Sequence, residues 1–255
     1  MSNRRAMMFS LGGLPGTNFL TNLVAYYSFD ASNATDIHTG TNNGTVIGSP
    51  TFPSGKNGNC IDFGNDNNFN YVNIADSTDF SFTNEITDVP FSISMWVNFQ
   101  GFGSVGSWLI NKRGNTSGSD EWSFAYAGGI LTFAKFQFNN NGIVQLIRTS
   151  SSIFSTNTWY HIVYTDNGTS LVGSGQIYIN GALNVASNSN SGGIYTRMNN
   201  GNSITRLGLN SWSTDSGFKH KGKLDEIAIW KNRQLTALEV TELYNAGAGK
   251  FYNTF

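Results

Sequence analysis

The sequence predicts an all-β fold built from antiparallel sheets, with one short helix near the C-terminus. Charged residues make up 12% of the chain and aromatic residues 14%, so Asn, Ser, Thr and Gly must supply much of the polar surface, and these residues favour turns over helices. From Leu23 onward, short segments of alternating apolar and polar residues are separated by turn-forming residues. A single helix-capping pattern occurs close to the end of the chain.

The chain is expected to form one domain with an N-terminal arm. A length of 255 residues is common for a single β-sandwich. Residues 1–22 show no useful periodicity, and Pro15 with the glycines around it indicates a loop-like segment. We therefore divide the chain into an arm or tether over residues 1–22 and a folded domain over residues 23–255. The arm is either disordered or an anchor that orders on a partner.

The clearest strand is expected over Phe91–Phe99. Its odd-numbered residues are all apolar and its even-numbered residues are mostly polar, a period of two that predicts a half-buried strand. The pair Asn180-Gly181 predicts a hairpin, because both residues tolerate the positive φ of a type I′ turn. Further strands, to a total of roughly a dozen at about 5–6 residues each, are expected over residues 23–29, 60–63, 71–74, 107–112, 122–127, 130–138, 144–149, 159–165, 204–209 and 223–230.

The predicted helix covers residues 237–245. Thr236 and Glu239 form a capping-box pattern, and Leu235 and Val240 form a hydrophobic staple around it. Gly247 is expected to end the helix in the left-handed conformation. We expect this helix to cover an end of the core and to carry no chemistry.

Several partner classes are not expected. The net charge is −1 and no basic cluster exceeds the pair Arg4–Arg5, which disfavours nucleic acid as a partner. No apolar run reaches the ~18 residues of a membrane span. The apolar part of the N-terminus, Ala6–Leu11, is shorter than a signal peptide needs, so export by the general route is not expected. Cys60 is the single cysteine, and we expect it to be a packed apolar residue.

The order of several motifs resembles the laminin-G-like, concanavalin A-like lectin/glucanase superfamily. The resemblance implies a two-sheet antiparallel jelly-roll sandwich, and the final stretch is its most specific part. That stretch combines a Gly, a Leu-Asp-Glu strand, Asn-Arg-Gln-Leu and a capped helix. The superfamily includes carbohydrate-binding modules, adhesion domains, lectins, glycoside hydrolases and virion proteins, so the fold alone does not decide the function. The matching segments are residues 23–30, 41–46, 91–97, 157–165, 177–184 and 205–247.

The carboxylates do not form the pattern expected of a glycosidase. A retaining enzyme needs two carboxyl groups about 5–5.5 Å apart, and residues i and i+2 share a face of a strand. The hydrolase branch of the superfamily carries Glu-x-Asp on one strand, whereas no Asp or Glu pair in this sequence is two residues apart. Asp120–Glu121 and Asp225–Glu226 are adjacent and are expected to point to opposite faces. We expect a non-enzyme, although two acids from different strands could still meet.

Three aspartates are candidate calcium ligands: Asp30, Asp36 and Asp225. Asp30 ends the first strand, and Asp36 follows in a loop rich in oxygen donors. Asp225 is expected to share a face with Ile227 and Ile229, at the rim of the core. Calcium takes 6–8 oxygen ligands and occurs in many members of the superfamily at differing positions. The alternative is that these residues form Asx-turns and backbone hydrogen bonds.

Loop residues around 102–120 and 210–218 are the candidate ligand-binding groups. A sugar site needs an exposed aromatic platform and amide hydrogen-bonding groups. Trp212 is the best single candidate, because it lies between two strands among polar neighbours. The same position also suits a side chain that covers a sandwich edge. The remaining candidates are Trp108, Asn115, Asn210 and Asp215, with Phe102 and Tyr195 as further loop aromatics.

The sequence favours a non-catalytic virion surface protein, either a capsid decoration or a fibre-type adhesin. A sandwich without an export signal or a disulfide, preceded by a short loop-like arm, suits a particle assembled in the host cytoplasm. Such a protein would display the lectin-like domain to host or environmental glycans and attach to a capsid or tail protein through residues 1–22. The alternative is a secreted or cell-surface carbohydrate-binding module, and a glycoside hydrolase is the third hypothesis. Oligomerisation is left open.

Overall fold

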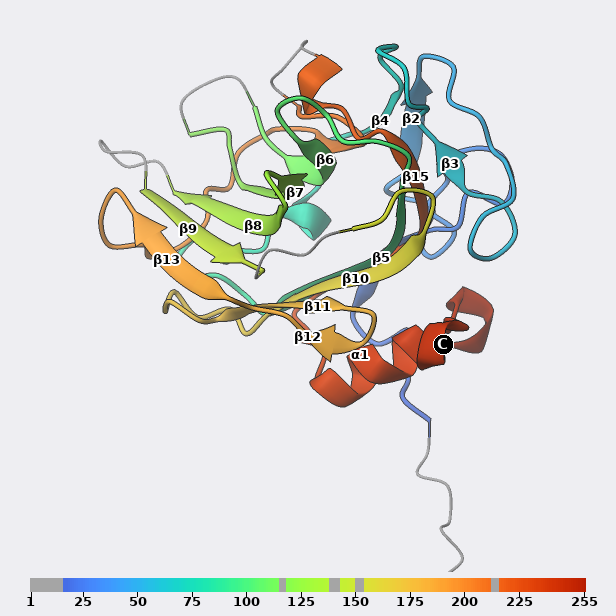
Figure 1. Cartoon of the computed structure of the whole chain (residues 1–255). Helices are drawn as coiled ribbons and strands as arrows, with labels where there is room; N and C mark the ends of the chain where they lie inside the picture. The colour runs from blue at the N-terminus through green and yellow to red at the C-terminus, as the bar shows by residue number, and fades with distance from the viewer. Residues whose placement is uncertain (1–15, 115–117, 138–142, 150–153, 212–215) are drawn as a thin grey trace, which may run out of the picture.

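Two antiparallel sheets pack face to face and form the body of the chain (Figure 1). The computed structural model describes residues 16–114, 118–137, 143–149, 154–211 and 216–255. The predicted all-β class, the two-sheet jelly-roll sandwich and the single C-terminal helix are confirmed.

The sheets contain seven and eight strands within the described part of the chain. The seven-stranded sheet has the order β1 (Leu23–Tyr27), β15 (Gly222–Lys231), β5 (Phe91–Phe99), β10 (Trp159–Asp166), β11 (Gly175–Ile179) and β12 (Ala182–Leu183), with β3 (Ile61–Asp62) also paired to β15. The eight-stranded sheet has the order β13 (Ser187–Ser191), β9 (Ile143–Arg148), β8 (Ile130–Gln137), β7 (Trp122–Ala127), β6 (Ser107–Lys112), β14 (Thr205–Leu207), β4 (Tyr71–Ile74) and β2 (Gly44–Ile47). The helical elements are α1 (Ala237–Tyr244) and four short 3₁₀ turns, η1 (Thr78–Phe80), η2 (Ser216–Phe218), η3 (Asn245–Gly247) and η4 (Tyr252–Thr254).

The main core lies between the two sheets and is rich in aromatic rings. Phe133 of β8 stacks on Tyr164 of β10 with ring centroids 3.7 Å apart and an interplanar angle of 4°. Phe91 of β5 packs against both rings, at 5.7 Å and 5.3 Å between centroids. These contacts join strands of opposite sheets, so burial of aromatic surface holds the sandwich together.

Strand β5 has the predicted bounds, but the prediction that it is half-buried is wrong. All nine of its residues are buried. Its inner face contacts the main core, and on its outer face the ring of Trp96 stacks on Tyr244 of α1. A period of two shows that the two faces differ in residue type, but it does not show whether another element covers the more polar face.

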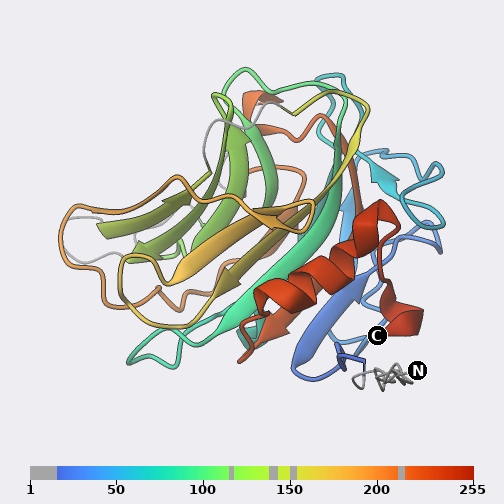
Figure 2. The same ribbon diagram turned by 60° about the horizontal axis from the view of Figure 1, so that its bottom comes forward.

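Helix α1 lies across the outer face of the seven-stranded sheet, and not over an end of the core as expected (Figure 2). Val240 and Leu243 of the helix belong to a second apolar cluster with Tyr26, Tyr178 and Trp230 of the sheet. We call this second cluster, completed by Phe19, Leu23, Val163, Ala228 and Leu235, the outer core.

Local capping determines where the helix begins and ends. The Thr236 side chain accepts from the Glu239 N–H, and the Glu239 carboxylate accepts from the Thr236 N–H, so the predicted capping box is present. The C-cap is Asn245, with φ of 47° in the left-handed region. The expectation that Gly247 ends the helix is therefore wrong, because Asn also tolerates this conformation and comes first in the chain.

The last residues of the expected arm pack on the domain. Phe19 is fully buried, 5.3 Å from the ring of Phe255, and its carbonyl accepts from the Trp230 indole N–H at 2.7 Å. The Thr17 hydroxyl donates to the Glu242 carboxylate at 2.6 Å. Residues 1–15 lie outside the described residues.

Two leucines of α1 test the importance of the outer core. Leu243 is 2% exposed, whereas Leu238 on the same helix is 83% exposed. We expect Leu243→Ala to lower the free energy of unfolding by about 2–5 kcal/mol, because it leaves a cavity against the sheet. The matched control Leu238→Ala should change it by less than about 0.5 kcal/mol. Urea denaturation measures both values, and equal losses would contradict this role of the outer core.

Candidate functional site

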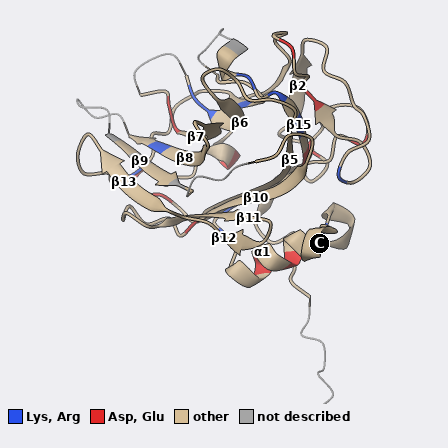
Figure 3. Cartoon of the chain, in the orientation of Figure 1, with Lys and Arg blue, Asp and Glu red and all other residues tan. Residues whose placement is uncertain are grey.

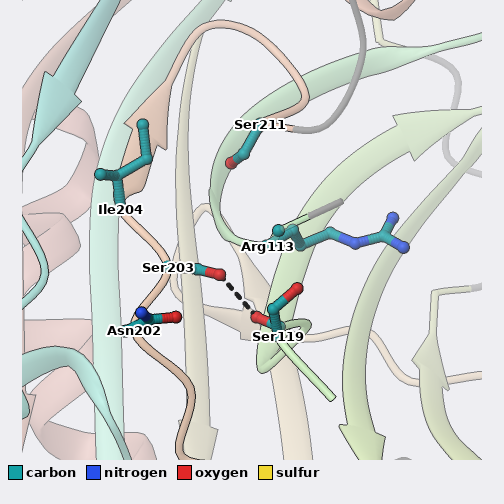
Figure 4. A pocket seen from close by; sticks show the side chains of 7 residues that line it. Arg113, Ser119, Asn202, Ser203, Ile204 and Ser211 are labelled. Carbon is teal, nitrogen blue, oxygen red and sulfur yellow. Dashed lines mark hydrogen bonds between the residues drawn. The ribbon is translucent and has the colours of Figure 1, made fainter. Parts of the chain in front are cut away.

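A polar pocket lies between two loops of the eight-stranded sheet (Figure 4). One wall follows β6, and the other comes from the segments that precede and follow β14. Its volume is about 420 Å³. We call this cavity the loop pocket; its lining residues are Arg113, Gly114, Ser119, Asn202, Ser203, Ile204 and Ser211. The structure thus brings together described residues from both loop regions that the sequence pointed to.

A buried ion pair beneath the pocket positions the segment before β14. The Lys112 ammonium contacts the Glu121 carboxylate, and both side chains are fully buried. Glu121 Oε1 also accepts from the Gly201 N–H at 3.0 Å. Burial raises the pKa of Glu121 to about 7, and the opposing attraction of Lys112 lowers it. The pair therefore connects the base of the β6–β7 loop to the chain that enters β14.

Arg113 lies at the wall of the pocket, and Asp120 holds its guanidinium, which extends away from Asn202 and Ser203 (Figure 4). The guanidinium donates from Nε at 3.0 Å and from Nη2 at 2.8 Å to the two oxygens of Asp120. It also lies 4.3 Å from the centre of the Phe136 ring. A bidentate pair of this kind fixes the arginine in place and compensates its charge. The pocket therefore combines polarity with little net charge.

Small polar side chains line the rest of the cavity. The Ser203 hydroxyl donates to the Ser119 carbonyl at 2.7 Å, the contact dashed in Figure 4. The Ser211 hydroxyl donates to the Asn111 side chain, and Asn202 is exposed. Hydroxyl and amide groups of this kind can bind a hydroxylated ligand, and none of the described lining residues is an acid.

The ligand-binding residues expected from the sequence have different surroundings. Asn210 is buried beside Ser211, and its carbonyl accepts from Arg206 Nη1 at 3.2 Å. The half-buried Trp108 ring packs 4.9 Å from the ring of Phe218 and does not line the pocket. Trp212, Asp215 and Asn115 lie outside the described residues.

The two further loop aromatics are not in the loop pocket. Phe102 is partly exposed and lines a separate cavity with Tyr126, whereas Tyr195 is buried and donates to Asp88 at 2.8 Å. No residue pattern distinguishes Ser119, Asn202, Ser203 or Ser211, because serine and asparagine are abundant throughout the chain.

His161 is buried inside strand β10. Its Nε2 lies 2.8 Å from the Ser94 hydroxyl, and its ring packs against both Trp96 and Tyr244. Complete burial lowers the pKa of His161 to about 3. The side chain is therefore neutral at physiological pH and shielded from solvent.

Two of the aspartates considered as calcium ligands already accept protein hydrogen bonds. Asp36 is buried, and its carboxylate accepts from the N–H groups of Tyr26 and His38, each at 3.0 Å, and from the Thr39 hydroxyl at 2.6 Å. Asp30 is exposed and accepts from the Asn59 N–H at 2.9 Å. These bonds are of the kind expected for loop-forming aspartates.

Asp225 lies on the outer face of its sheet, because a β-bulge changes the alternation of β15. Glu226 has a positive φ of 51°, and the pairing shifts by one residue between Asp225 and Ala228. Leu224, Ile227 and Ile229 therefore face the main core. Asp225 instead pairs with Trp96 on the other face. The expectation that Asp225 shares a face with the two isoleucines is wrong, since an inserted residue inverts the pattern.

The Asp225 carboxylate is bound by backbone N–H groups. Its Oδ2 accepts from Lys56 at 2.7 Å and from Asn57 at 3.2 Å, and Oδ1 accepts from Glu226 at 2.9 Å. A side chain at Gly55 would collide with Oδ2, so this glycine lets the loop approach. Burial raises the pKa of Asp225 to about 8 and that of Glu226 to about 7.

Two further features are absent from the part of the chain that the structure describes. No group of three or more His, Cys, Asp or Glu side chains in this part of the chain is placed to hold a metal ion. No helix in it is long and apolar enough to cross a membrane.

Three solved structures are similar to this chain in fold. The binding domain of Paraclostridial Mosquitocidal Protein 1 has a TM-score of 0.67 and 19% identity, over 90% of this chain and 53% of that one. The binding domain of Botulinum Neurotoxin DC, in complex with SialylT, has a TM-score of 0.63 and 18% identity, over 90% and 52%. Domain 4 of AbnA, a GH43 extracellular arabinanase from Geobacillus stearothermophilus in complex with arabinotriose, has a TM-score of 0.57 and 18% identity, over 87% and 97%.

The chain spans about half the length of the two toxin structures. At these identities the similarity concerns the fold. No protein with a curated description matches the chain in sequence. The model of the family described as the concanavalin A-like lectin/glucanases superfamily matches residues 64–241, well over half of the chain. This match and the two-sheet fold together show that the chain belongs to the concanavalin A-like lectin/glucanases superfamily.

Proposed function

We propose that this chain is a glycan-binding module and that the loop pocket holds a neutral oligosaccharide. The observation that carries the proposal is the composition of the pocket wall: hydroxyl, amide and backbone groups around a charge-compensated arginine. Sugar hydroxyl groups both donate and accept hydrogen bonds, so they match such a wall. An acidic sugar is a poorer match, because Asp120 already neutralises Arg113.

Similar folds that carry saccharides support this choice. Domain 4 of the arabinanase was solved with arabinotriose, and it is matched over nearly its whole length. The botulinum neurotoxin binding domain was solved with SialylT. These ligands belong to those proteins, and the arabinotriose complex, matched over 97% of its chain, supports sugar recognition by a sandwich of this kind.

Binding is favoured over hydrolysis by the surroundings of the acidic groups nearest the loop pocket. Asp120 is engaged by Arg113, and Glu121 is fully buried against Lys112. A glycosidase needs one carboxyl to donate a proton and a second to attack or activate water. Both nearby carboxyls are instead used to hold the pocket together.

Asn202→Ala tests the loop pocket as the glycan site. Loss of a ligand hydrogen bond worth about 1–1.5 kcal/mol should weaken binding roughly tenfold. A neutral-glycan array identifies a ligand, and calorimetric titration then compares affinities. Asn253→Ala, an exposed asparagine beside α1 in η4, is the matched control and should bind like the wild type. An array without binding, or equal affinity of all three proteins, would refute the proposal.

The proposed setting of this module is a virion surface, as a capsid decoration or fibre-type adhesin held by its N-terminal arm. The geometry that supports it is the separation of the two ends: Phe19 packs in the outer core beside α1, whereas the loop pocket follows β6 of the other sheet (Figure 1). A capsid or tail protein bound to the arm would leave the pocket facing outward. A secreted or cell-surface module would use the same pocket.

Removal of residues 1–15, which retains the buried Phe19, tests this attachment. The shortened chain should fold with an unchanged melting temperature but be lost from assembled particles. Quantitative mass spectrometry of purified particles measures its incorporation relative to the full chain. Equal incorporation would reject the arm as the attachment segment.

A separate proposal is calcium binding at Asp30, Asp36 or Asp225, each acting with backbone or water oxygens, because the described residues bring no three such side chains together around an ion. Its support is chemical, since carboxylate oxygens are the donors calcium prefers. A bound ion should make the melting temperature higher in calcium than in chelator. The reason is that binding to the folded state adds RT ln(1 + [L]/Kd) to the free energy of unfolding. Differential scanning calorimetry measures the shift, and Asp30→Asn should reduce it. Identical melting curves in calcium and chelator would reject the site.

A further inference from the structure

Three charged side chains meet in the interior between the two sheets. Lys135 projects from β8 of the eight-stranded sheet, Asp166 from the end of β10 of the opposite sheet, and Asp88 from the loop before β5. The Lys135 ammonium lies 3.0 Å from Asp166 Oδ2 and 3.1 Å from Asp88 Oδ2. All three side chains have 0% exposure, so one amine and two carboxyl groups share a site shielded from solvent.

Aromatic side chains surround this cluster. The Tyr195 ring centre lies 5.1 Å from the Lys135 Nζ, and Tyr164, stacked on Phe133, donates to Asp166 Oδ2 at 2.6 Å. Two carboxylates and one ammonium would leave an uncompensated negative charge in an apolar interior, which is costly. Burial raises the pKa of Asp88, so a proton on Asp88 resolves the imbalance.

We propose that Lys135 and Asp88 are joined by an intramolecular amide bond, which the chain forms by itself with Asp166 as the proton acceptor. The two reacting groups are held in contact by the fold, and such positioning replaces a collision between separate molecules. The resulting link would tie β8 to the loop that leads into β5 of the opposite sheet.

The reaction balances without a cofactor. The Lys135 ammonium gives one proton to the Asp166 carboxylate, and the neutral amine attacks Cγ of the protonated Asp88. The Nζ–Cγ bond forms and one Cγ–O bond of Asp88 breaks. A second amine proton leaves with the hydroxyl of Asp88 as water, and the third remains on the amide nitrogen. The products are the amide, one water molecule and a protonated Asp166.

The hydrogen bonds assign the two aspartates to different roles. Asp166 accepts from the Tyr164 hydroxyl, from the Ser174 hydroxyl at 3.2 Å and from the Gly168 N–H at 2.8 Å, besides Lys135. These contacts hold the Asp166 carboxylate beside the Lys135 ammonium, within reach of its proton. Asp88 accepts from the Tyr195 hydroxyl at 2.8 Å and the Met198 N–H at 2.7 Å. With fewer donors, Asp88 is the group that reacts as the neutral acid.

Two other buried lysines lack this environment. Lys112 contacts the fully buried Glu121 and also Asp76, whose side chain is 41% exposed. Lys219 contacts Asp66, whose side chain is 55% exposed. Neither lysine therefore lies between two fully buried carboxyl groups. Lys219, with a solvent-exposed partner, supplies a matched control.

Intact mass spectrometry of the denatured wild-type chain tests the proposal directly. The expected mass is lower than that of the sequence by one water molecule. After trypsin digestion, peptide 57–112, which contains Asp88, should be linked to peptide 114–148, uncleaved at Lys135. A wild-type chain of full mass would overturn the proposal. A link between peptides 114–148 and 149–197 would overturn the assigned roles, because it would place the bond at Asp166.

Variants separate the roles of the three residues. Asp88→Ala and Asp166→Asn should both show the full mass. Asp88→Ala lacks the carboxyl group that forms the amide, and Asp166→Asn lacks the proton acceptor. Lys219→Arg should retain the mass deficit of the wild type. A deficit that persists in Asp88→Ala would contradict the proposal. The wild-type mass and peptide map decide the question even if a variant fails to fold.

Discussion

The seven-stranded sheet has to bury both of its faces, and much of the architecture depends on that constraint. Its inner face packs on the eight-stranded sheet through Phe91, Tyr164 and their neighbours. Its outer face carries Trp230 and Tyr26, which only a further layer can cover. Helix α1 and Phe19 provide this layer, so the described residues near both ends of the chain are held on one side (Figure 2). The described residues near the two ends of the chain do not cover the eight-stranded sheet in this way. The loop pocket lies at the loops of that sheet.

Buried ionic groups specify loop positions in this sandwich. Charged residues are few but several are fully buried, and Figure 3 shows Lys and Arg on the strands of both sheets. Buried ion pairs are weak sources of stability, because desolvation offsets their attraction. Their geometry is nevertheless strict. Lys112–Glu121 connects the chain entering β14 to β7 through the Gly201 N–H, and Lys135 with its two aspartates connects three segments far apart in sequence. The same groups therefore orient both the loop pocket and the two sheets.

Elements governed by neighbouring residues were predicted well. The bounds of β5, β6 and β7 match the expected strands, and Asn180 and Gly181 both have positive φ at the β11–β12 turn. The bulge at Glu226 was not predicted, although it reverses the face of Asp225. The residue types of β15 do not indicate this bulge, because Glu rarely adopts a positive φ. In the folded chain the Glu226 carboxylate accepts from Tyr26 and Asn57.

The sequence by itself determined the fold class, the helix cap and the hairpin, because period-two alternation, a capping box and turn residues act over a few neighbouring positions. The order of its motifs along the chain indicated the family by resemblance. It also pointed to the two loop regions that border the loop pocket. Only the tertiary structure decided which residues line that pocket, on which face of the sheet α1 lies and which carboxyls are buried. Ser119, Asn202 and Ser211 lie in loop segments that are far apart in the sequence. The Lys112–Glu121 and Arg113–Asp120 pairs help to bring these segments together. Contacts between residues so distant in sequence leave no local periodicity, so no pattern along the chain could reveal them.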